Sequence, residues 1–262
     1  MNRSRVVALC NQKGGVGKTT VACALAGELA ASGNVLVVDM DPQATATRAF
    51  GIEVADGQRT MLDALASTRS KQVEPGAALA GIIVQAMPPW YRVWVGPAER
   101  DLATCELDGS VGREALLRRA LEAARSTFDW ILVDCPPSLG ILTTNALVAA
   151  DTALIVTEPR EASVAAVAEM VATISAVRTA YAPWLTLAGV VVNKWMTHRL
   201  DRAEQRDALQ AMYGDYLIDA AIPDKPEVIG KATTAHTPIP SSATDVHEAV
   251  AAIADRLRGV LA

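Results

Sequence analysis

The feature that most constrains this chain is the segment RVVALCNQKGGVGKTTVACALAGELA at residues 5–30. An apolar, strand-like run ends at Cys10, a glycine-rich stretch follows, and an Ala- and Leu-rich helical pattern begins after Gly17. Glycines lack a Cβ atom, so the backbone can wrap closely around an anion. The first N–H groups of the following helix then point at that anion. The segment therefore predicts a phosphate-binding loop at the first strand-to-helix connection of an α/β fold.

The residues of this loop indicate which phosphate ligand it binds. Lys18 places a full positive charge near the β and γ phosphates of a nucleotide, and the Thr19 hydroxyl is a ligand for Mg²⁺. The alternative is a glycine-rich turn that binds nothing, which the G-K-T-T sequence at 17–20 disfavours. The residues that we expect to contact the nucleotide in this loop are Gly14, Gly15, Val16, Gly17, Lys18, Thr19 and Thr20.

Short apolar runs alternate with helical patterns along the rest of the chain. The predicted strands are 5–10, 34–40, 81–87, 91–96, 130–135, 152–158 and 185–193, with a weaker one at 217–223. The predicted helices include 18–32, 112–125, 161–179, 200–213 and 243–261. Continuous Val-, Ile- and Leu-rich runs are typical of strands that are covered on both faces. We therefore expect a single α/β domain over 1–262, with a mostly parallel twisted sheet flanked by helices on both faces.

Composition narrows the possible partners. The formal net charge of −5 argues against a chain that coats nucleic acid with its whole surface, although it allows a local basic patch. None of the four cysteines stands in C-x-x-C spacing, and the three histidines lack metal-ligand spacing, so no zinc site or redox pair is indicated. We find no signal peptide and no apolar run long enough to span a bilayer, which predicts a soluble, cytoplasmic protein.

The loop departs from the general pattern G-x-x-x-x-G-K-[ST], because Gln12 stands where that pattern has its first glycine. The chain reads K-G-G-V-G-K-T instead, which resembles the deviant Walker A motif of the ParA/MinD family of ATPases. The resemblance implies a P-loop NTPase-like fold, ATP or ADP and Mg²⁺ as ligands, and a homodimer that closes face to face over two ATP molecules. It also implies that Lys13 is the signature lysine, which contacts the nucleotide of the other subunit and acts in catalysis with Lys18.

The position of Lys13 suits that role. A lysine early in the loop is badly placed to serve the γ phosphate of its own subunit, but a facing subunit can use it. There it would neutralise charge that develops on the phosphates, as an arginine finger does. The alternative is a solvated loop lysine without a nucleotide contact.

Acidic residues follow two of the predicted strands. Asp39 and Asp41 lie in NVLVVDMDPQ, and Asp134 ends the strand of WILVDCPPSLG. Acids at the end of a buried strand are costly unless they serve a cation or a hydrogen-bond network, and ligands of open α/β sheets bind at this edge. By resemblance, D-x-D-P-Q is switch I, where Asp41 orients the attacking water and Asp39 supports the magnesium-water shell. Asp134 is the Walker B acid that holds magnesium through a water.

Further features of these segments also match the family. Thr19 is the fourth expected magnesium-site residue, and residues 136–138 resemble switch II. The alternative for each acid is a helix N-cap or a turn residue. The stretch TEPREASVAAV at 157–167 resembles a family segment in which dimer contacts often lie. Arg160 within it differs from the commoner forms, and we assign it no role.

The adenine site is assigned mainly by the resemblance. Asn193 follows a strand in GVVVNKW, and an amide can donate and accept hydrogen bonds at once, which suits an adenine edge. The family uses an asparagine here, together with main chain near the residues that correspond to Pro223 and Asp224. An asparagine after a strand is otherwise a turn former.

Family members differ in what they bind besides ATP, and many ParA-like proteins bind DNA without sequence preference as ATP-bound dimers. The candidate DNA-contacting residues here are Lys194, Arg199, Arg202 and Arg206. The arginines are spaced by three and four residues, so one helix face could present them to phosphates. Acidic residues interleave with them, and the alternative is a solvated helix with internal ion pairs.

The sequence therefore predicts a ParA-like partition ATPase, cytoplasmic and nucleoid-associated, that positions plasmid or chromosomal DNA. It would bind nonspecific DNA as an ATP-dependent homodimer, with slow Mg²⁺-dependent hydrolysis stimulated by a ParB-like or cargo-adaptor protein. One alternative is the same ATPase core acting on a protein cargo, as in McdA-like proteins. Another is a MinD-like regulator at a membrane surface, although residues 245–262 contain no Trp or Phe and read as a helix packed on the core.

Two further variants of the family are disfavoured by the sequence. The chain begins almost at its first strand, so we expect no N-terminal helix-turn-helix. The nitrogenase iron-protein branch shares the phosphate loop but needs interface cysteines for its cluster, and the cysteines here show no such arrangement.

Overall fold

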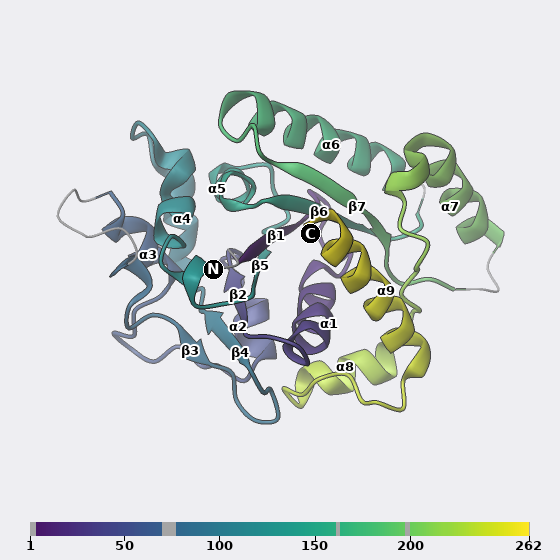
Figure 1. Ribbon diagram of the computed structural model, residues 1–262, viewed down its shortest axis with the longest axis horizontal. Helices are drawn as coiled ribbons and strands as arrows, with labels where there is room; N and C mark the ends of the chain where they lie inside the picture. Colours follow the sequence, from purple (N-terminus) through teal and green to yellow (C-terminus); the bar gives the residue numbers. More distant parts are fainter. Residues whose placement is uncertain (1–3, 70–76, 161–162, 197–199, 262) are drawn as a thin grey trace.

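The computed structural model describes residues 4–69, 77–160, 163–196 and 200–261, without the side chains of 200–202. Its centre is a seven-stranded sheet in the order β3-β4-β2-β5-β1-β6-β7 (Figure 1). The strands are β1 Arg5–Cys10, β2 Val35–Asp39, β3 Val84–Gln85, β4 Val93–Gly96, β5 Trp130–Asp134, β6 Thr152–Thr157 and β7 Thr186–Val192. All neighbouring strands are parallel except β3 and β4. The predicted α/β class with a mostly parallel sheet is confirmed.

Helices cover both faces of this sheet. They are α1 Lys18–Ala30, α2 Thr45–Ala49, α3 Met61–Ser67, α4 Leu116–Ala120, α5 Ile141–Ala149, α6 Ser163–Ala180, α7 Leu200–Tyr213, α8 Pro226–Thr234 and α9 Thr244–Val260. Short 3₁₀ turns lie at Ala77–Leu79, Arg100–Leu107, Arg113–Ala115, Ala124–Ser126 and Gly214–Tyr216. Figure 1 shows α1 and α9 on one side of the sheet and α5 and α6 on the other.

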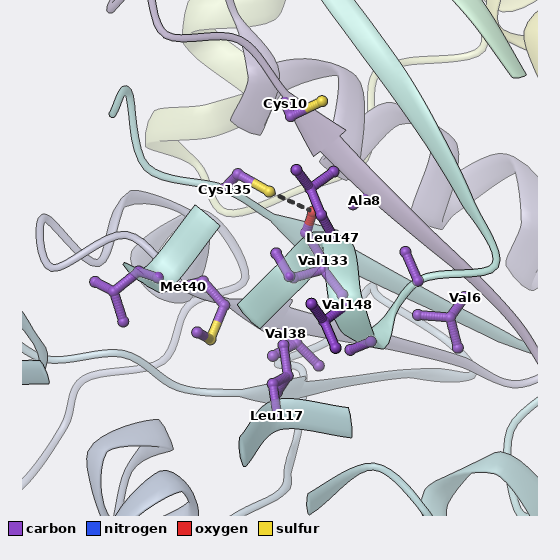
Figure 2. Close-up of a cluster of buried hydrophobic side chains, with 14 of the residues drawn as sticks. Val6, Ala8, Cys10, Val38, Met40, Leu117, Val133, Cys135, Leu147 and Val148 are labelled. Carbon is purple, nitrogen blue, oxygen red and sulfur yellow. Dashed lines mark hydrogen bonds between the residues drawn. The ribbon is translucent and has the colours of Figure 1, made fainter. Parts of the chain in front are cut away.

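The hydrophobic core consists of two clusters, one on each face of the sheet. On β1, Val6, Ala8 and Cys10 join the buried cluster under α4, α5 and α6. Val7 and Leu9 join the cluster under α1 and α9. Successive side chains of a strand point to opposite faces, so an apolar residue is needed at every position. Figure 2 shows side chains of β1, β2 and β5 meeting those of α4 and α5.

Three predicted elements differ in the structure. The segment 217–223 makes no strand; it touches β7 and the residues after it through isolated bridges at Leu217 and Pro223. Proline has no N–H for a ladder, so pairing cannot continue there. The strand predicted at 81–87 is reduced to β3, an antiparallel edge strand. The helix predicted at 112–125 is broken into α4 and flanking 3₁₀ turns, and begins after the left-handed Gly112.

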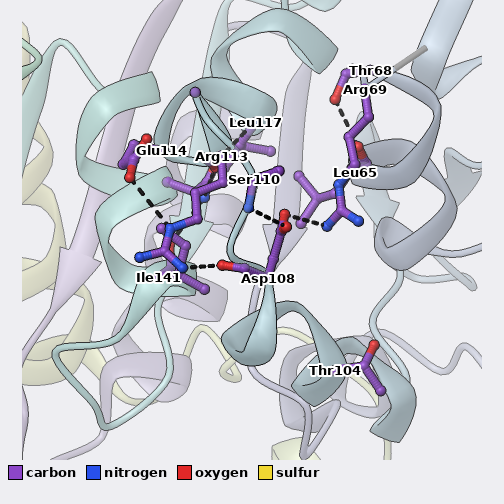
Figure 3. Close-up of polar contacts among 12 residues, drawn as sticks. Leu65, Thr68, Arg69, Thr104, Asp108, Ser110, Arg113, Glu114, Leu117 and Ile141 are labelled. Carbon is purple, nitrogen blue, oxygen red and sulfur yellow. Dashed lines mark hydrogen bonds and ion pairs between the residues drawn. The ribbon is translucent and has the colours of Figure 1, made fainter.

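The connection between β4 and β5 is held by polar contacts. Asp108 accepts a hydrogen bond from the Ser110 N–H at 2.9 Å and pairs with Arg69 at 2.7 Å. Its carbonyl oxygen accepts from Arg113, as Figure 3 shows. These contacts give a long irregular connection hydrogen-bond partners that a strand or helix would otherwise supply.

Helix α6 corrects the expectation that no stretch is long and apolar enough to cross a bilayer. Its 18 residues have a mean hydropathy of 1.3, which meets that length and composition test. In the fold, Val167, Met170, Ile174 and Val177 of this helix are buried in the cluster on one face of the sheet. Part of the apolar surface of α6 therefore packs against the sheet.

Candidate nucleotide-binding site

The predicted phosphate loop lies between β1 and α1. Gly15 and Gly17 have φ angles of 75° and 92°, in the left-handed region that side chains disfavour. A Cβ atom at Gly17 would lie 2.1 Å from Nδ2 of Asn193, so glycine is required there for space as well. Within the part of the chain that the structure describes, no side chain caps the first turn of α1. The amides of that turn are therefore available to bind an anion.

A threonine, a lysine and an aspartate converge beside the loop. The Lys18 side chain is buried, and its Nζ donates to the carbonyl oxygen of Lys13 at 3.5 Å. The Thr19 hydroxyl donates to Oδ2 of Asp134 at 2.6 Å. The other carboxylate oxygen of Asp134, Oδ1, is buried and has no hydrogen-bond partner among the described residues. A buried carboxylate oxygen without a partner, next to a threonine hydroxyl, fits the oxygen ligands and water shell that Mg²⁺ prefers.

The electrostatics of the site favour a bound cation. Asp39 and Asp134 are opposite each other in the register of β2 and β5, and both are buried. Burial, reinforced by the charge of Asp39, raises the pKa of Asp134 to about 8. Burial also raises the pKa of Asp39 to about 6, although hydrogen bonds from Thr47 and Asp41 oppose the rise. A divalent cation would relieve this repulsion between the two carboxylates.

The segment after β2, which we predicted to be switch I, is fixed by hydrogen bonds to Asp39. The Thr47 N–H and hydroxyl donate to Oδ2 of Asp39 at 2.8 and 2.7 Å, and the Asp41 N–H donates to Oδ1 at 3.1 Å. Asp41 itself is half-buried, and its Oδ1 accepts from the Gln43 N–H at 2.9 Å. Asp39 thus determines where Asp41 stands relative to the end of β2, and both acids lie at the edge of the sheet that carries the loop.

Sequence reasoning missed Glu158, which directly follows β6. Its side chain is only 5% exposed and pairs with Lys13 at 3.0 Å, Arg160 at 3.1 Å and Lys194 at 3.9 Å. Lys13 therefore points its Nζ toward Glu158 in its own subunit. A signal was available, because Glu158 is an acid at the end of a buried strand, as Asp39 and Asp134 are.

The end of β7 is attached to the loop. Nδ2 of Asn193 donates to the carbonyl oxygen of Val16 at 2.9 Å, and Asn193 is buried. The Trp195 N–H donates to the carbonyl oxygen of Ile222, and the Trp195 carbonyl oxygen accepts from the Asp224 N–H. Asn193 therefore contacts the loop, and Pro223 and Asp224 lie against Trp195, two residues further along the chain. That they bind adenine stays a prediction.

The predicted DNA-contacting residues are only partly described. Nζ of Lys194 donates to the carbonyl oxygen of Gly15, so this side chain folds over the phosphate loop. Arg206 pairs with Asp219 at 2.6 Å and lies over the Trp195 ring at 5.6 Å. Arg199 and the side chain of Arg202 lie outside the described residues. A shared basic face on α7 therefore stays a prediction.

Comparisons with known proteins agree with this geometry. Residues 4–187 match the AAA domain family. The chromosome partitioning protein ParA of Caulobacter vibrioides is 35% identical over 227 residues, which cover 85% of this chain and 81% of that protein. Cobyrinic acid a,c-diamide synthase of Mycobacterium smegmatis, crystallised with ADP and magnesium, is 31% identical with a TM-score of 0.74, covering 89% of this chain and 91% of that one.

A likeness in fold alone extends further. An ATP complex of a McdA variant from Cyanothece superposes with a TM-score of 0.87 at 21% identity, covering 98% of each chain. The parallel sheet, the glycine loop after β1 and the acid that ends β5 define the class of P-loop NTPases. This chain belongs to the AAA domain family and, within it, to the ParA/MinD group of P-loop ATPases, as its loop sequence indicated.

Proposed function

We propose that this protein is a partition-type ATPase that binds ATP or ADP with Mg²⁺ and hydrolyses ATP as a homodimer. The proposal rests on the different positions of two lysines in the same loop. Lys18 is buried, with its Nζ on the carbonyl oxygen of Lys13, whereas Nζ of Lys13 points to Glu158 and 30% of the Lys13 side chain is exposed. One lysine suffices for the phosphates of its own subunit, so the second is left for a facing one.

Each residue of the site has its own role in the proposed hydrolysis. Amides of the loop and Lys18 bind the β and γ phosphates, and Thr19 and Asp134 hold the magnesium with its waters. The metal neutralises phosphate charge when bound. Asp41 orients a water that attacks the γ phosphorus, and the bond to the leaving ADP oxygen breaks, which yields ADP and inorganic phosphate. Lys13 of the facing subunit stabilises the charge of that transition state.

Two variants separate the steps. Asp41→Ala removes the group that orients water but no group that binds phosphate, so we expect ATP-dependent dimers with little turnover. Lys13→Ala should still bind ATP but lose hydrolysis. Light scattering at several protein concentrations, together with a phosphate-release assay, measures both. Full hydrolysis by a protein that stays monomeric at every concentration would refute the proposal.

Nonspecific DNA is the partner that the proposal assigns to the ATP-bound dimer. Its support is the family relationship and the arginines at 199, 202 and 206 of one predicted helix face. Contacts of this kind bind phosphate, so affinity should fall steeply with salt and depend little on base sequence. Gel shifts with random duplexes measure it, with Arg206→Ala as the variant and Arg178→Ala, at the exposed end of α6, as the matched control. Equal binding by both variants would exclude Arg206 from the contact.

A membrane-surface role is not favoured by the C-terminal helix. Val246, Val250, Ile253 and Leu257 on the apolar face of α9 are buried in the cluster that also contains α1 residues. An amphipathic helix whose apolar face already packs on the core has none left for lipid. Cosedimentation with anionic vesicles in ATP tests this, and we expect the protein to stay in the supernatant.

A stimulating ParB-like or adaptor protein completes the proposed cycle. When it is added to the ATPase assay, it should raise the rate of ATP turnover.

A further inference from the structure

Glu158, which the hydrolysis scheme does not use, is the centre of an ion cluster. Three cations from separate segments surround this one buried carboxylate. They are Lys13 from the phosphate loop, Arg160 from the turn after β6, and Lys194 from the turn after β7. The Ser163 hydroxyl also donates to the Glu158 carbonyl oxygen, which holds its backbone in place. A buried carboxylate needs paired charge, but one or two cations would suffice.

Lys13 cannot bind Glu158 and serve a second subunit at the same time. Its Nζ is 3.0 Å from Oε1 of a side chain that is 5% exposed, enclosed by its own subunit. A triphosphate from a facing subunit could reach Nζ there only by approaching the Glu158 carboxylate, which like charge disfavours. The pair must therefore open before Lys13 can act in trans.

Arg160 and Lys194 lower the cost of that opening. Arg160 Nε stands 3.1 Å from Oε2 of Glu158, the oxygen that Lys13 does not contact, and Lys194 Nζ stands 3.9 Å from the same oxygen. When Lys13 leaves, the carboxylate still has two cations. Breaking a buried pair is severe when it leaves a charge uncompensated, and this cluster avoids that outcome.

We propose that Glu158 is a positioning residue that holds Lys13 within its own subunit until the dimer forms, and that Arg160 and Lys194 take over the carboxylate when Lys13 leaves. This rests on the proposed trans role of Lys13. The pair acts as a latch that opposes dimerisation: it keeps Lys13 engaged in the single subunit, and both copies must open when two subunits close. The cluster therefore sets the protein concentration at which the ATP-bound dimer forms.

The test compares dimerisation of four proteins: wild type, Glu158→Gln, Lys13→Ala and the double variant. Sedimentation velocity with a nonhydrolysable ATP analogue and Mg²⁺ gives each dimer dissociation constant. Lys13 is 30% exposed and Glu158 keeps two other cations when the pair opens, so we take each pair at the scale of a surface salt bridge, about a threefold factor. Two pairs open per dimer, so Glu158→Gln should lower the constant by roughly tenfold. In the Lys13→Ala background the same substitution should change it by less than about twofold, because the latch is already absent.

A second variant predicts a change of opposite sign. Arg160→Ala removes a cation that competes for Glu158, so Lys13 should be held more tightly in both subunits and the dissociation constant should rise by up to roughly tenfold. The Arg160 side chain is 57% exposed, so we expect this variant to fold even if Glu158→Gln does not. Glu158→Asp, which keeps the charge, should stay within about threefold of wild type. Asp151→Asn breaks a different ion pair, that with Arg125, and controls for loss of stability alone.

The outcomes separate the two proposals. If wild type fails to dimerise with the analogue, the trans role of Lys13 fails and the latch fails with it. If wild type dimerises but Glu158→Gln and Arg160→Ala leave the constant unchanged, only the latch is overturned. It is overturned as well if Glu158→Gln acts equally in the Lys13→Ala background, or if Asp151→Asn reproduces its effect.

Discussion

The contact between Gly17 and Asn193 gives a sharp test of the loop geometry. Replacing Gly17 by alanine would place a Cβ atom 2.1 Å from Nδ2 of Asn193, well inside any real contact distance. The Asn193 amide would have to move and release the carbonyl oxygen of Val16, which it now contacts at 2.9 Å. The new side chain would also sit at a φ of 92°. Gly15→Ala is the matched control, because its φ is 75° but no atom lies within 4 Å of its added Cβ.

The two substitutions share one cost and differ in another. A non-glycine residue in the left-handed region costs about 1–2 kcal/mol, and both variants incur it. Both also gain the same small stabilisation from a less flexible unfolded chain. Only Gly17→Ala leaves a buried amide without its partner, which costs about 1–3 kcal/mol more. We therefore expect Gly17→Ala to be less stable than Gly15→Ala by about 1–3 kcal/mol.

Urea unfolding of the nucleotide-free protein, followed by circular dichroism, measures this difference. Repeating both substitutions in an Asn193→Ala background should shrink it, since the side chain that clashes is then gone. Equal free energies of unfolding for the two glycine variants would show that Asn193 does not press on the loop. An unchanged difference in the Asn193→Ala background would attribute it to another neighbour.

Two further predictions concern buried charged groups and their partners. Burial raises the pKa of Asp134 to about 8 and that of Asp39 to about 6, whereas the pKa of an aspartate in the unfolded chain is about 4. The folded state therefore binds these protons more tightly than the unfolded state does. The resulting contribution to the stability of the ligand-free fold is fully present below about pH 4 and is lost as the pH rises through about 8. Asp134→Asn should flatten this decline in urea unfolding between pH 5 and 8, and an equally steep decline would contradict the assignment. The Arg125 side chain is 5% exposed and donates to both carboxylate oxygens of Asp151 at 3.0 Å. Asp151→Asn should therefore lower the free energy of unfolding by about 3 kcal/mol. A decrease of less than about 1 kcal/mol would show that the fold does not need this ion pair.

The first strand, loop and helix could be predicted from the sequence because every signal is local. Val and Leu on both faces of β1, glycines at left-handed positions and an uncapped helix start all lie within residues 5–30. The acids that end β2 and β5 could be predicted on the same basis, because a carboxylate at the end of an apolar strand is conspicuous.

Other elements gave weaker local signals. Two threonines at 143–144 lower the helix propensity of α5, and α2 is only five residues long. The start of α3 could have been found, since Thr60 and Asp63 form a capping box there. The segment 217–223 looks like a strand because it is apolar, but it meets its neighbours only at isolated points.

The cluster around Glu158 could not be assembled from sequence. Lys13 and Glu158 are far apart in the chain, and Lys194 comes from a third segment. Only the order of β1, β6 and β7 in the sheet brings these loops to one edge. The same holds for Asn193, whose contact with Val16 depends on that strand order.

The strand order also determines when the phosphate loop can form during synthesis. β1 precedes the other six strands in the sequence but lies inside the sheet, where its neighbours are β5 and β6. Those strands end at Asp134 and Thr157, so synthesis must pass Thr157 before β1 is paired on both sides. Until then an apolar strand has both edges free to pair wrongly. Nascent chains shorter than this should depend on chaperones, and the nucleotide can stabilise the protein only after β6 has joined the sheet.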